Sequence, residues 1–323
     1  MLFWILGYVA LVLLLGAALA PGLFFATRAM VEQWPENPLS QVLEDKEFPS
    51  YFNRAALLVA VAGLFPLLRA LRLPWGEVLG EERATTGWRN LLVGFVLAVV
   101  FVAVMGWACW WVGASKLLPE DRRTGDWLNP VMPLVSGFAV GVVEEFLFRG
   151  AVLGILVRTL GARSGLAWST GIFALVHFLK PPLEGELNAE AVTWSSGFWV
   201  VSQLFRGFGQ WQNVTAEFLL LVAVGWVLAR ARLATGGLWA SIGLHAGWVA
   251  GMKYFGQMTL VTHALRDDGF APWMVRNTCR AIVSPVVGLV PLATVLLTGV
   301  LALALLQRRT LAEGQKAIAS APE

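Results

Sequence analysis

The chain has 323 residues, of which 57% are hydrophobic and only 14% are charged, whereas about a quarter of the residues in soluble domains are charged. Its mean hydropathy of +0.67 and its repeated apolar runs, many near the roughly 20 residues that cross a bilayer, exclude a soluble globular domain and predict an integral membrane protein. The net charge of +3 comes from scattered basic residues, so no nucleic-acid partner is expected.

The apolar runs predict an all-α bundle of about eight transmembrane helices, treated as one polytopic domain over residues 1–323. The first run, Leu2 to about Phe25, has no Lys or Arg before its apolar core, which favours an anchor helix over a cleaved signal peptide; cleavage would leave seven spans. The other predicted spans are Ala55 to Leu68, Leu91 to Val112, a helix from about Pro130 that carries the motif quoted below, Ser164 to Leu179, Thr215 to Leu228, Leu238 to Tyr254 and Val283 to Leu306.

The short loops on one side of these spans are the more basic ones. They include Arg69 and Arg72 after the second span, and Arg308 and Arg309 after the eighth. By the positive-inside rule, this pattern predicts that both termini lie in the cytoplasm, with the protein in the plasma (inner) membrane.

The stretch "GVVEEFLFRG", Gly141 to Gly150, places three charged residues inside an apolar run. Glu145 and Arg149 are four residues apart and share a helix face, so they can form an ion pair. Glu144 points about 100° away and must find its partner elsewhere in the chain. A glutamate in a membrane span is a functional-site hypothesis by default, although the three residues could equally form a structural network between helices.

Two of the three histidines, His177 and His245, also lie in predicted spans, while His263 lies in a polar loop and is expected at the surface. A lone histidine in a membrane helix is often only an interhelical hydrogen bond. Two histidines together with Glu144 could instead hold and activate a water molecule. They would do so with a bound metal, or with glutamate as general base and imidazoles as hydrogen-bond donors.

These motifs and their order, Glu-Glu-x3-Arg, Phe-x3-His (Phe173 and His177) and a later His245 after "GGLWASIGL", resemble the CPBP family of intramembrane proteases. That family contains the Rce1-type CAAX prenyl endopeptidases and many bacterial Abi proteins. The resemblance covers residues 131–251, the expected catalytic core, and implies a catalytic cavity within the bilayer. It also implies that Glu144 is the base, that His177 is its partner, and that His245 is an oxyanion stabiliser or metal ligand. Glu145, Arg149 and Phe173 would support them.

The sequence departs from the prenyl endopeptidases four residues after His245, where Val249 stands in place of an asparagine that would donate to the oxyanion. A valine side chain cannot donate a hydrogen bond. Two arrangements can compensate: Zn²⁺ bound by Glu144, His177 and His245, or a metal-free site in which another Ser, Trp or backbone N–H donates. The resemblance favours the metal-free site, with zinc as the alternative cofactor and a metalloprotease as the alternative class.

We therefore expect an intramembrane endopeptidase that cuts a membrane-associated protein or peptide near its C-terminus or membrane anchor. A proton-coupled transporter is an alternative, because an intramembrane glutamate and two histidines also suit a proton relay. A catalytically silent membrane chaperone or immunity protein is another. The aromatic segment from Thr193 to Asn213 is expected to lie at the membrane interface, or to gate the substrate.

Overall fold

The computed structural model consists of helices joined by loops and two short strand pairs, in the part of the chain that it describes. Contacts along the chain divide it into two compact units, Met1–Leu73 with Leu175–Val214 and Pro74–Ala174 with Thr215–Glu323. The described residues are 2–37, 40, 43–44, 46–80, 82–111, 113–122, 128–179, 187–204, 211–261, 276–277 and 286–319.

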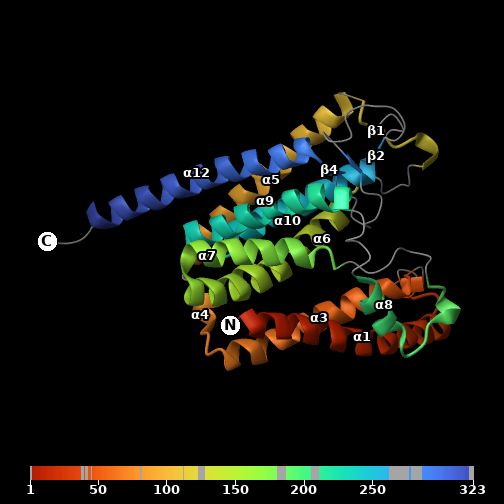
Figure 1. The fold of residues 1–323 in the computed structure, drawn as a ribbon. Helices are drawn as coiled ribbons and strands as arrows, with labels where there is room; N and C mark the ends of the chain where they lie inside the picture. The colour runs from red at the N-terminus through yellow and green to blue at the C-terminus, as the bar shows by residue number, and fades with distance from the viewer. Residues whose placement is uncertain are drawn as a thin grey trace. The chain divides into compact units, whose positions relative to one another are not determined.

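The first unit is built on helices α1 (Leu2–Gln33) and α3 (Phe48–Ala70), which lie side by side, with the short helix α8 (Ser196–Gln203) against them (Figure 1). Edge-to-face contacts of Phe24 with Phe48 and Tyr51 fill the space between α1 and α3. α3 begins seven residues before the predicted Ala55, because Pro49 fits the first turn of a helix.

The aromatic segment between the predicted fifth and sixth spans belongs partly to α8. Gly197 of α8 lies directly against the backbone of Ala17 in α1, and the Trp194 ring lies 5.3 Å from Phe25. Residues 205–210 of the segment lie outside the described part. The prediction that the segment lies at the membrane interface remains a prediction.

The second unit holds the remaining helices and both strand pairs. Its strands pair antiparallel, β1 with β2 and β3 with β4. Its elements are α4 (Trp75–Leu79), α5 (Ala84–Trp111), β1 (Ser115–Leu117), the 3₁₀ helix Glu120–Arg122, α6 (Val131–Glu145), the π-helical segment Phe146–Val152, most of α7 (Leu153–Val176), most of α9 (Trp211–Thr235), α10 (Trp239–Met258), β2 (Thr259–Val261), β3 (Arg276–Asn277), β4 (Val286–Val287) and α12 (Leu289–Ala319).

Helix α10 packs closely against both α5 and α6 because small residues recur along it. A Cβ atom added to Gly247 would lie 2.6 Å from the Phe95 carbonyl oxygen of α5. On the α6 side, a Cβ atom on Gly137 would lie 2.6 Å from the Ala246 carbonyl oxygen. Small residues at four-residue spacing allow membrane helices to approach to backbone contact, so these glycines set the distance at which side chains of α6 and α10 meet.

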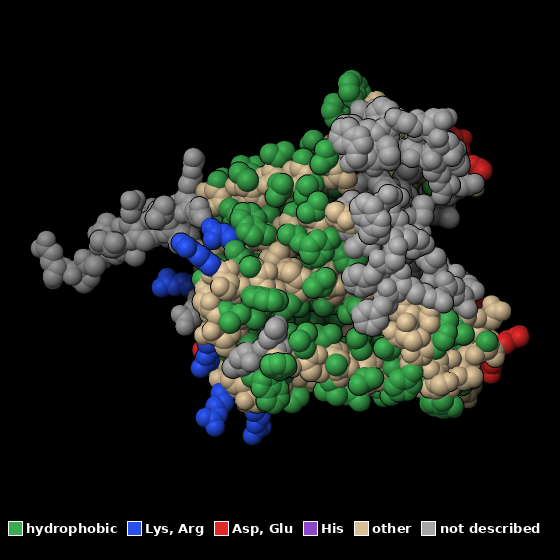
Figure 2. Space-filling model, viewed as in Figure 1, with side chains coloured by type: hydrophobic (Ala, Val, Ile, Leu, Met, Phe, Trp, Pro, Cys, Tyr) green, Lys and Arg blue, Asp and Glu red, His purple; other side chains and the backbone are tan. Residues whose placement is uncertain are grey.

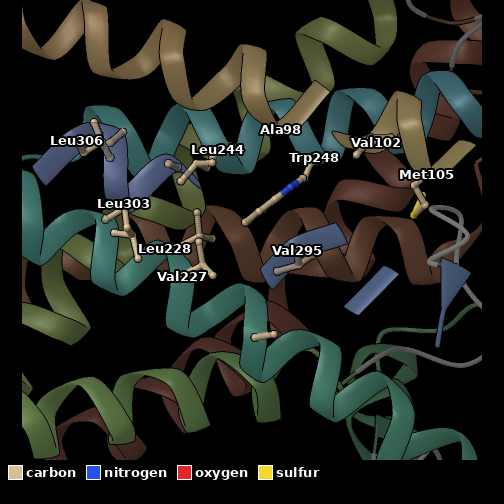
Figure 3. Close-up of a cluster of buried hydrophobic side chains, with 14 of the residues drawn as sticks. Ala98, Val102, Met105, Val227, Leu228, Leu244, Trp248, Val295, Leu303 and Leu306 are labelled. Carbon is tan, nitrogen blue, oxygen red and sulfur yellow. The ribbon is translucent and has the colours of Figure 1, made fainter. Parts of the chain in front are cut away.

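A cluster of buried hydrophobic side chains lies on another side of α10. Helices α5, α9, α10 and α12 all contribute to it. Figure 3 shows Trp248 extending into this cluster, towards Val227 and above Val295. The cluster fixes the rotation of α10. Ala240, Leu244 and Trp248 recur every four residues along the side that faces it, and His245 follows Leu244 by one residue, about 100° around the helix.

In the part of the chain that the structure describes, helices at five of the eight predicted spans are long and apolar enough to cross a membrane, namely α1, α3, α5, α9 and the Leu289–Leu306 part of α12. They indicate a multi-pass integral membrane protein. Hydrophobic side chains also cover much of the helix flanks in the view of Figure 2. Large apolar residues of α5 such as Leu92 and Trp107 are exposed.

The other three predicted spans correspond to helices that bear the motifs and fall outside that set of five. α6 has only 15 residues before it becomes π-helical. α7 turns at Gly161, whose φ of 79° lies in the left-handed region that favours glycine. α10 contains His245 and Lys253 among small residues, which lowers its hydropathy. The number of eight transmembrane helices stays a prediction.

Candidate active site

Glu144 and Glu145 are the last two residues of α6, and the chain continues directly into the π-helical segment that contains Arg149. π-helical turns are rare and occur frequently at functional sites. In this segment Gly150 packs tightly, since a Cβ atom there would lie 2.9 Å from the Val78 side chain. The acidic pair is therefore held at a junction between two helix types.

Glu145 is completely buried and binds two cationic or polar groups. Its Oε1 lies 3.1 Å from Nη1 of Arg149 and 2.8 Å from Nδ1 of His245. Ser241, one turn before His245 on α10, also lies close enough to interact with this carboxylate. A buried charge is tolerated only when it is paired and hydrogen-bonded, so Glu145 depends on these neighbours.

Arg149 links the site to two further helices of the second unit. Its guanidinium is buried, and Nη2 donates to the Gly225 carbonyl oxygen of α9 at 3.3 Å. The same guanidinium lies over the Phe173 ring of α7, 4.1 Å from the ring centroid, a distance within the range of a cation–π interaction. Phe173 also packs edge-on against Phe148 and His245.

The His245 ring lies between the two glutamates. Nδ1 faces Glu145, and Nε2 lies 3.8 Å from Oε2 of Glu144. An ionised carboxylate only accepts hydrogen bonds, so the proton on Nδ1 is assigned from this contact. Glu145 thereby fixes the orientation of the ring, and Nε2 is directed at Glu144.

The two adjacent glutamates have different exposure. The Glu144 side chain keeps 27% of its surface accessible, whereas Glu145 has none. The Glu144 side chain is therefore partly open to solvent, although its Oε2, the atom that faces His245, is buried, whereas Glu145 is inaccessible. This difference suits one residue for chemistry and the other for support.

The structure brings together five of the site residues named from the sequence. Glu144, Glu145, Arg149, Phe173 and His245 all lie within one network of contacts in the second unit. His177 follows directly on the last residue of α7 and belongs to the first unit. His263 lies outside the described residues.

Sequence reasoning missed the contact between Glu145 and His245, which are 100 residues apart. It treated Glu145 only as the partner of Arg149. The one available signal was that Glu145 and His245 both lie in segments rich in small residues, which permits close helix packing. Such packing does not by itself say which side chains meet.

The groups proposed as metal ligands and oxyanion donors can be compared with these positions. Among the described residues, no three His, Cys, Asp or Glu side chains are grouped as metal ligands, and the metalloprotease alternative gains no support. The indole N–H of Trp248 is buried in the hydrophobic cluster and has no partner in the described part of the chain. Trp248 therefore makes no hydrogen bond to Glu144 in this structure.

Together, the helices and this network define a multi-pass membrane protein with a paired carboxylate–imidazole cluster at a helix junction. Residues 126–251 match the family model described as Type II CAAX prenyl endopeptidase Rce1-like, and over these residues the chain carries a domain of this family, the CPBP family. The match begins five residues before the predicted core at 131 and ends with it at 251. No curated protein and no solved structure matches the chain.

Proposed function

We propose that the protein is an intramembrane endopeptidase in which Glu144 activates the attacking water. Its family implies a protease with peptide substrates. The observation that carries the proposal is the position of His245, whose Nδ1 is 2.8 Å from buried Glu145 and whose Nε2 is 3.8 Å from accessible Glu144. A base next to an oriented imidazole is one combination that can catalyse peptide hydrolysis.

In the proposed reaction, the Glu144 carboxylate takes a proton from water, and the hydroxide adds to the scissile carbonyl carbon. His245 donates from Nε2–H to the resulting oxyanion when its ring carries protons on both nitrogens. The carbon–nitrogen bond then breaks, and Glu144 gives its proton to the leaving nitrogen. The products are a new carboxylic acid and a new amine, and Glu144 is regenerated as a carboxylate.

Three further elements of the proposal come from the family and the sequence. His177 assists Glu144 in holding the water. The substrate is a membrane-associated protein or peptide cut near its C-terminus or membrane anchor, in keeping with the CAAX prenyl endopeptidase description. The catalytic cavity lies within the bilayer of the plasma membrane, with both termini in the cytoplasm.

The contacts of His245 fit the metal-free form of this chemistry, which the family resemblance favours, and they equally fit a metal-bound imidazole, which donates its other ring N–H to a carboxylate. Nδ1 of His245 is engaged by Glu145, which leaves one imidazole nitrogen and the Glu144 carboxylate as donor atoms in the described site. A catalytic zinc centre has three protein ligands, so His177 would have to complete it. Zinc would then polarise the scissile carbonyl and activate water.

The test is hydrolysis of a quenched fluorescent peptide by detergent-purified protein. The peptide carries a prenylated cysteine followed by three apolar residues. Glu144→Gln removes the base while nearly preserving shape, and we expect turnover to fall by roughly 10² to 10⁴-fold, the usual contribution of a general base. The matched control is Glu77→Gln, at an exposed glutamate of the same unit. Equal turnover in wild type and Glu144→Gln, with both folded, would contradict the proposal.

A further inference from the structure

Two rows of side chains flank the contact between α6 and α10. Ser136, Val140 and Glu144 recur every four residues on α6, and His245, Val249 and Lys253 do so on α10. We call these six residues the α6/α10 seam. Five of them are half-exposed, whereas the residues of the direct helix contact, including Gly137, Gly141, Ala246 and Ala250, are buried. The seam is therefore an accessible strip that begins at the candidate active site.

The two helices run antiparallel along this strip, which has a polar group at each end. Glu144 and His245 meet at one end, and at the other end Nζ of Lys253 donates to the Ser136 hydroxyl. Val140 and Val249 occupy the middle. Val249 is the residue that replaces the asparagine of the prenyl endopeptidases, so the middle of the seam presents an apolar surface.

Lys253 is a cation with unused hydrogen-bonding capacity. An ammonium group has three donors, and Ser136 accepts from one of them. In the described part of the chain, no carboxylate lies within ion-pair distance of Lys253. A lysine in a membrane helix is costly and usually marks an ion or substrate path, or reaches to the interface, so this side chain is available to an external anion.

This end of the seam is also held in place. The Tyr254 hydroxyl donates to the Leu128 carbonyl oxygen at 3.0 Å, and Nε2 of Gln257 donates to the Asn129 carbonyl oxygen at 3.3 Å. Both bonds fix the C-terminal half of α10 to the chain that enters α6. Lys253 therefore extends from a positioned backbone, at a set distance from Glu144.

That distance matches a short peptide. Lys253 is eight residues from His245, and Ser136 is eight residues from Glu144, which corresponds to about 12 Å along a helix. Three extended residues span up to about 10–11 Å, and an ammonium–carboxylate hydrogen bond adds about 2.8 Å. A peptide bound in the seam with its scissile bond at Glu144 would bring a C-terminal carboxylate three residues downstream to Lys253.

We propose that Lys253 and Ser136 bind the free C-terminal carboxylate of the substrate, while Val140 and Val249 contact the apolar side chains of the segment that is cut off. This inference rests on the proposed function and adds a specificity site to it. The carboxylate anchor sets where the peptide is cut, about three residues from its end. Hydrolysis then releases a tripeptide with a new amine at Glu144 and its original carboxylate at Lys253.

The experiment compares cleavage of two prenylated peptides that differ only at the C-terminus, one a free acid and one an amide. For the wild type we expect kcat/KM to be roughly 10 to 100-fold higher on the acid, the effect of a charged hydrogen bond. Lys253→Met should remove this preference by lowering kcat/KM for the acid peptide only. Lys253→Arg should keep much of the preference. The control is Lys116→Met, at an exposed lysine of β1 close to the end of α10.

A second series varies the released segment from two to five residues. The wild type should favour three residues, and Lys253→Met should flatten this profile. If the wild type cleaves acid and amide equally and Lys253→Met changes neither, the inference is overturned while the proposed function stands. If Lys253→Met acts only in vesicles with anionic lipid, the lysine binds a lipid headgroup and the inference is again overturned. Failure of the wild type to cleave any peptide overturns both.

Discussion

Glu144 and Glu145 are adjacent, identical in chemistry and opposite in environment. Glu145 has no accessible surface and is bound by Arg149 and His245, while Glu144 is partly accessible and faces the other nitrogen of the same imidazole. A carboxylate already bound by two partners is suited to holding the His245 ring in position. A carboxylate with access to water is suited to proton transfer, and the single helical step of 100° between them produces this division.

Breaking the buried Glu145–Arg149 ion pair should lower the free energy of unfolding far more than breaking an exposed ion pair. Arg149→Ala leaves Glu145 buried with its main cation removed, and we expect the free energy of unfolding to fall by about 3–5 kcal/mol. Arg158→Ala removes an exposed ion pair, in which Nη1 lies 3.4 Å from Oε2 of Glu77, and should cost about 0–1 kcal/mol. Thermal unfolding of the detergent-purified variants measures both.

Thermal unfolding also distinguishes the residues that stabilise the fold, Glu145 and Arg149, from the proposed general base, Glu144. Glu144→Gln should unfold near the wild-type temperature. If Glu144→Gln lowered the unfolding temperature more than Arg149→Ala, the assignment of Glu145 and Arg149 as the structural pair would be wrong. If Arg149→Ala and Arg158→Ala lowered the free energy of unfolding equally, burial would not be what makes the Glu145–Arg149 pair important for stability.

At the scale of elements, the site depends on how closely α6 approaches α10. Gly137→Ala would place a Cβ atom 2.6 Å from the Ala246 carbonyl oxygen and 2.8 Å from the Ala250 side chain. Pushing the helices apart to relieve this contact should cost about 1–3 kcal/mol, and it should lower turnover because Glu144 and His245 would separate.

The matched control for this change is Gly154→Ala in α7, where an added Cβ atom meets nothing within 4 Å. Replacing a helical glycine with alanine in open space gains up to about 1 kcal/mol. Unfolding temperature and peptide turnover should therefore both fall for Gly137→Ala and hold or rise for Gly154→Ala. A stabilised and fully active Gly137→Ala would show that the close contact is not needed.

The length of the apolar runs predicted the long helices well and the ends of those helices less well. The five most apolar spans of the sequence all form long helices, because apolar length alone determines them. The π-helical segment at Phe146–Val152 was not predicted, since its wider turn depends on packing around Arg149 and Gly150. The turn at Gly161 was also missed, although α7 resumes close to the predicted start at Ser164.

At the scale of the whole molecule, residue types predicted the site better than they predicted its contacts. The motif spacing placed Glu145 and Arg149 on one face, because that relation is local. The pairing of Glu145 with His245, and of Ser136 with Lys253, joins residues 100 and 117 positions apart. Such pairs depend on which faces of α6 and α10 pack together, and the glycines that decide this carry no chemical signal of their own.

At this scale, the protein has five long apolar helices among its described residues and a family domain at residues 126–251, and it is proposed to cut peptides within the membrane. The most direct test of Glu144 as a general base is a single turnover in water enriched in ¹⁸O. Reconstituted protein is held in excess over the prenylated peptide, and the products and the protein are weighed by mass spectrometry.

If Glu144 activates water, the new carboxylate of the first-turnover product gains one ¹⁸O atom, and the segment of protein containing Glu144 gains none. If Glu144 instead attacked the carbonyl, and water then attacked the Glu144 carbonyl carbon of the resulting anhydride, the first product would carry ¹⁶O and the label would appear in Glu144. The first result is the one predicted here; the second, or cleavage that persists in Glu144→Gln, would contradict the account.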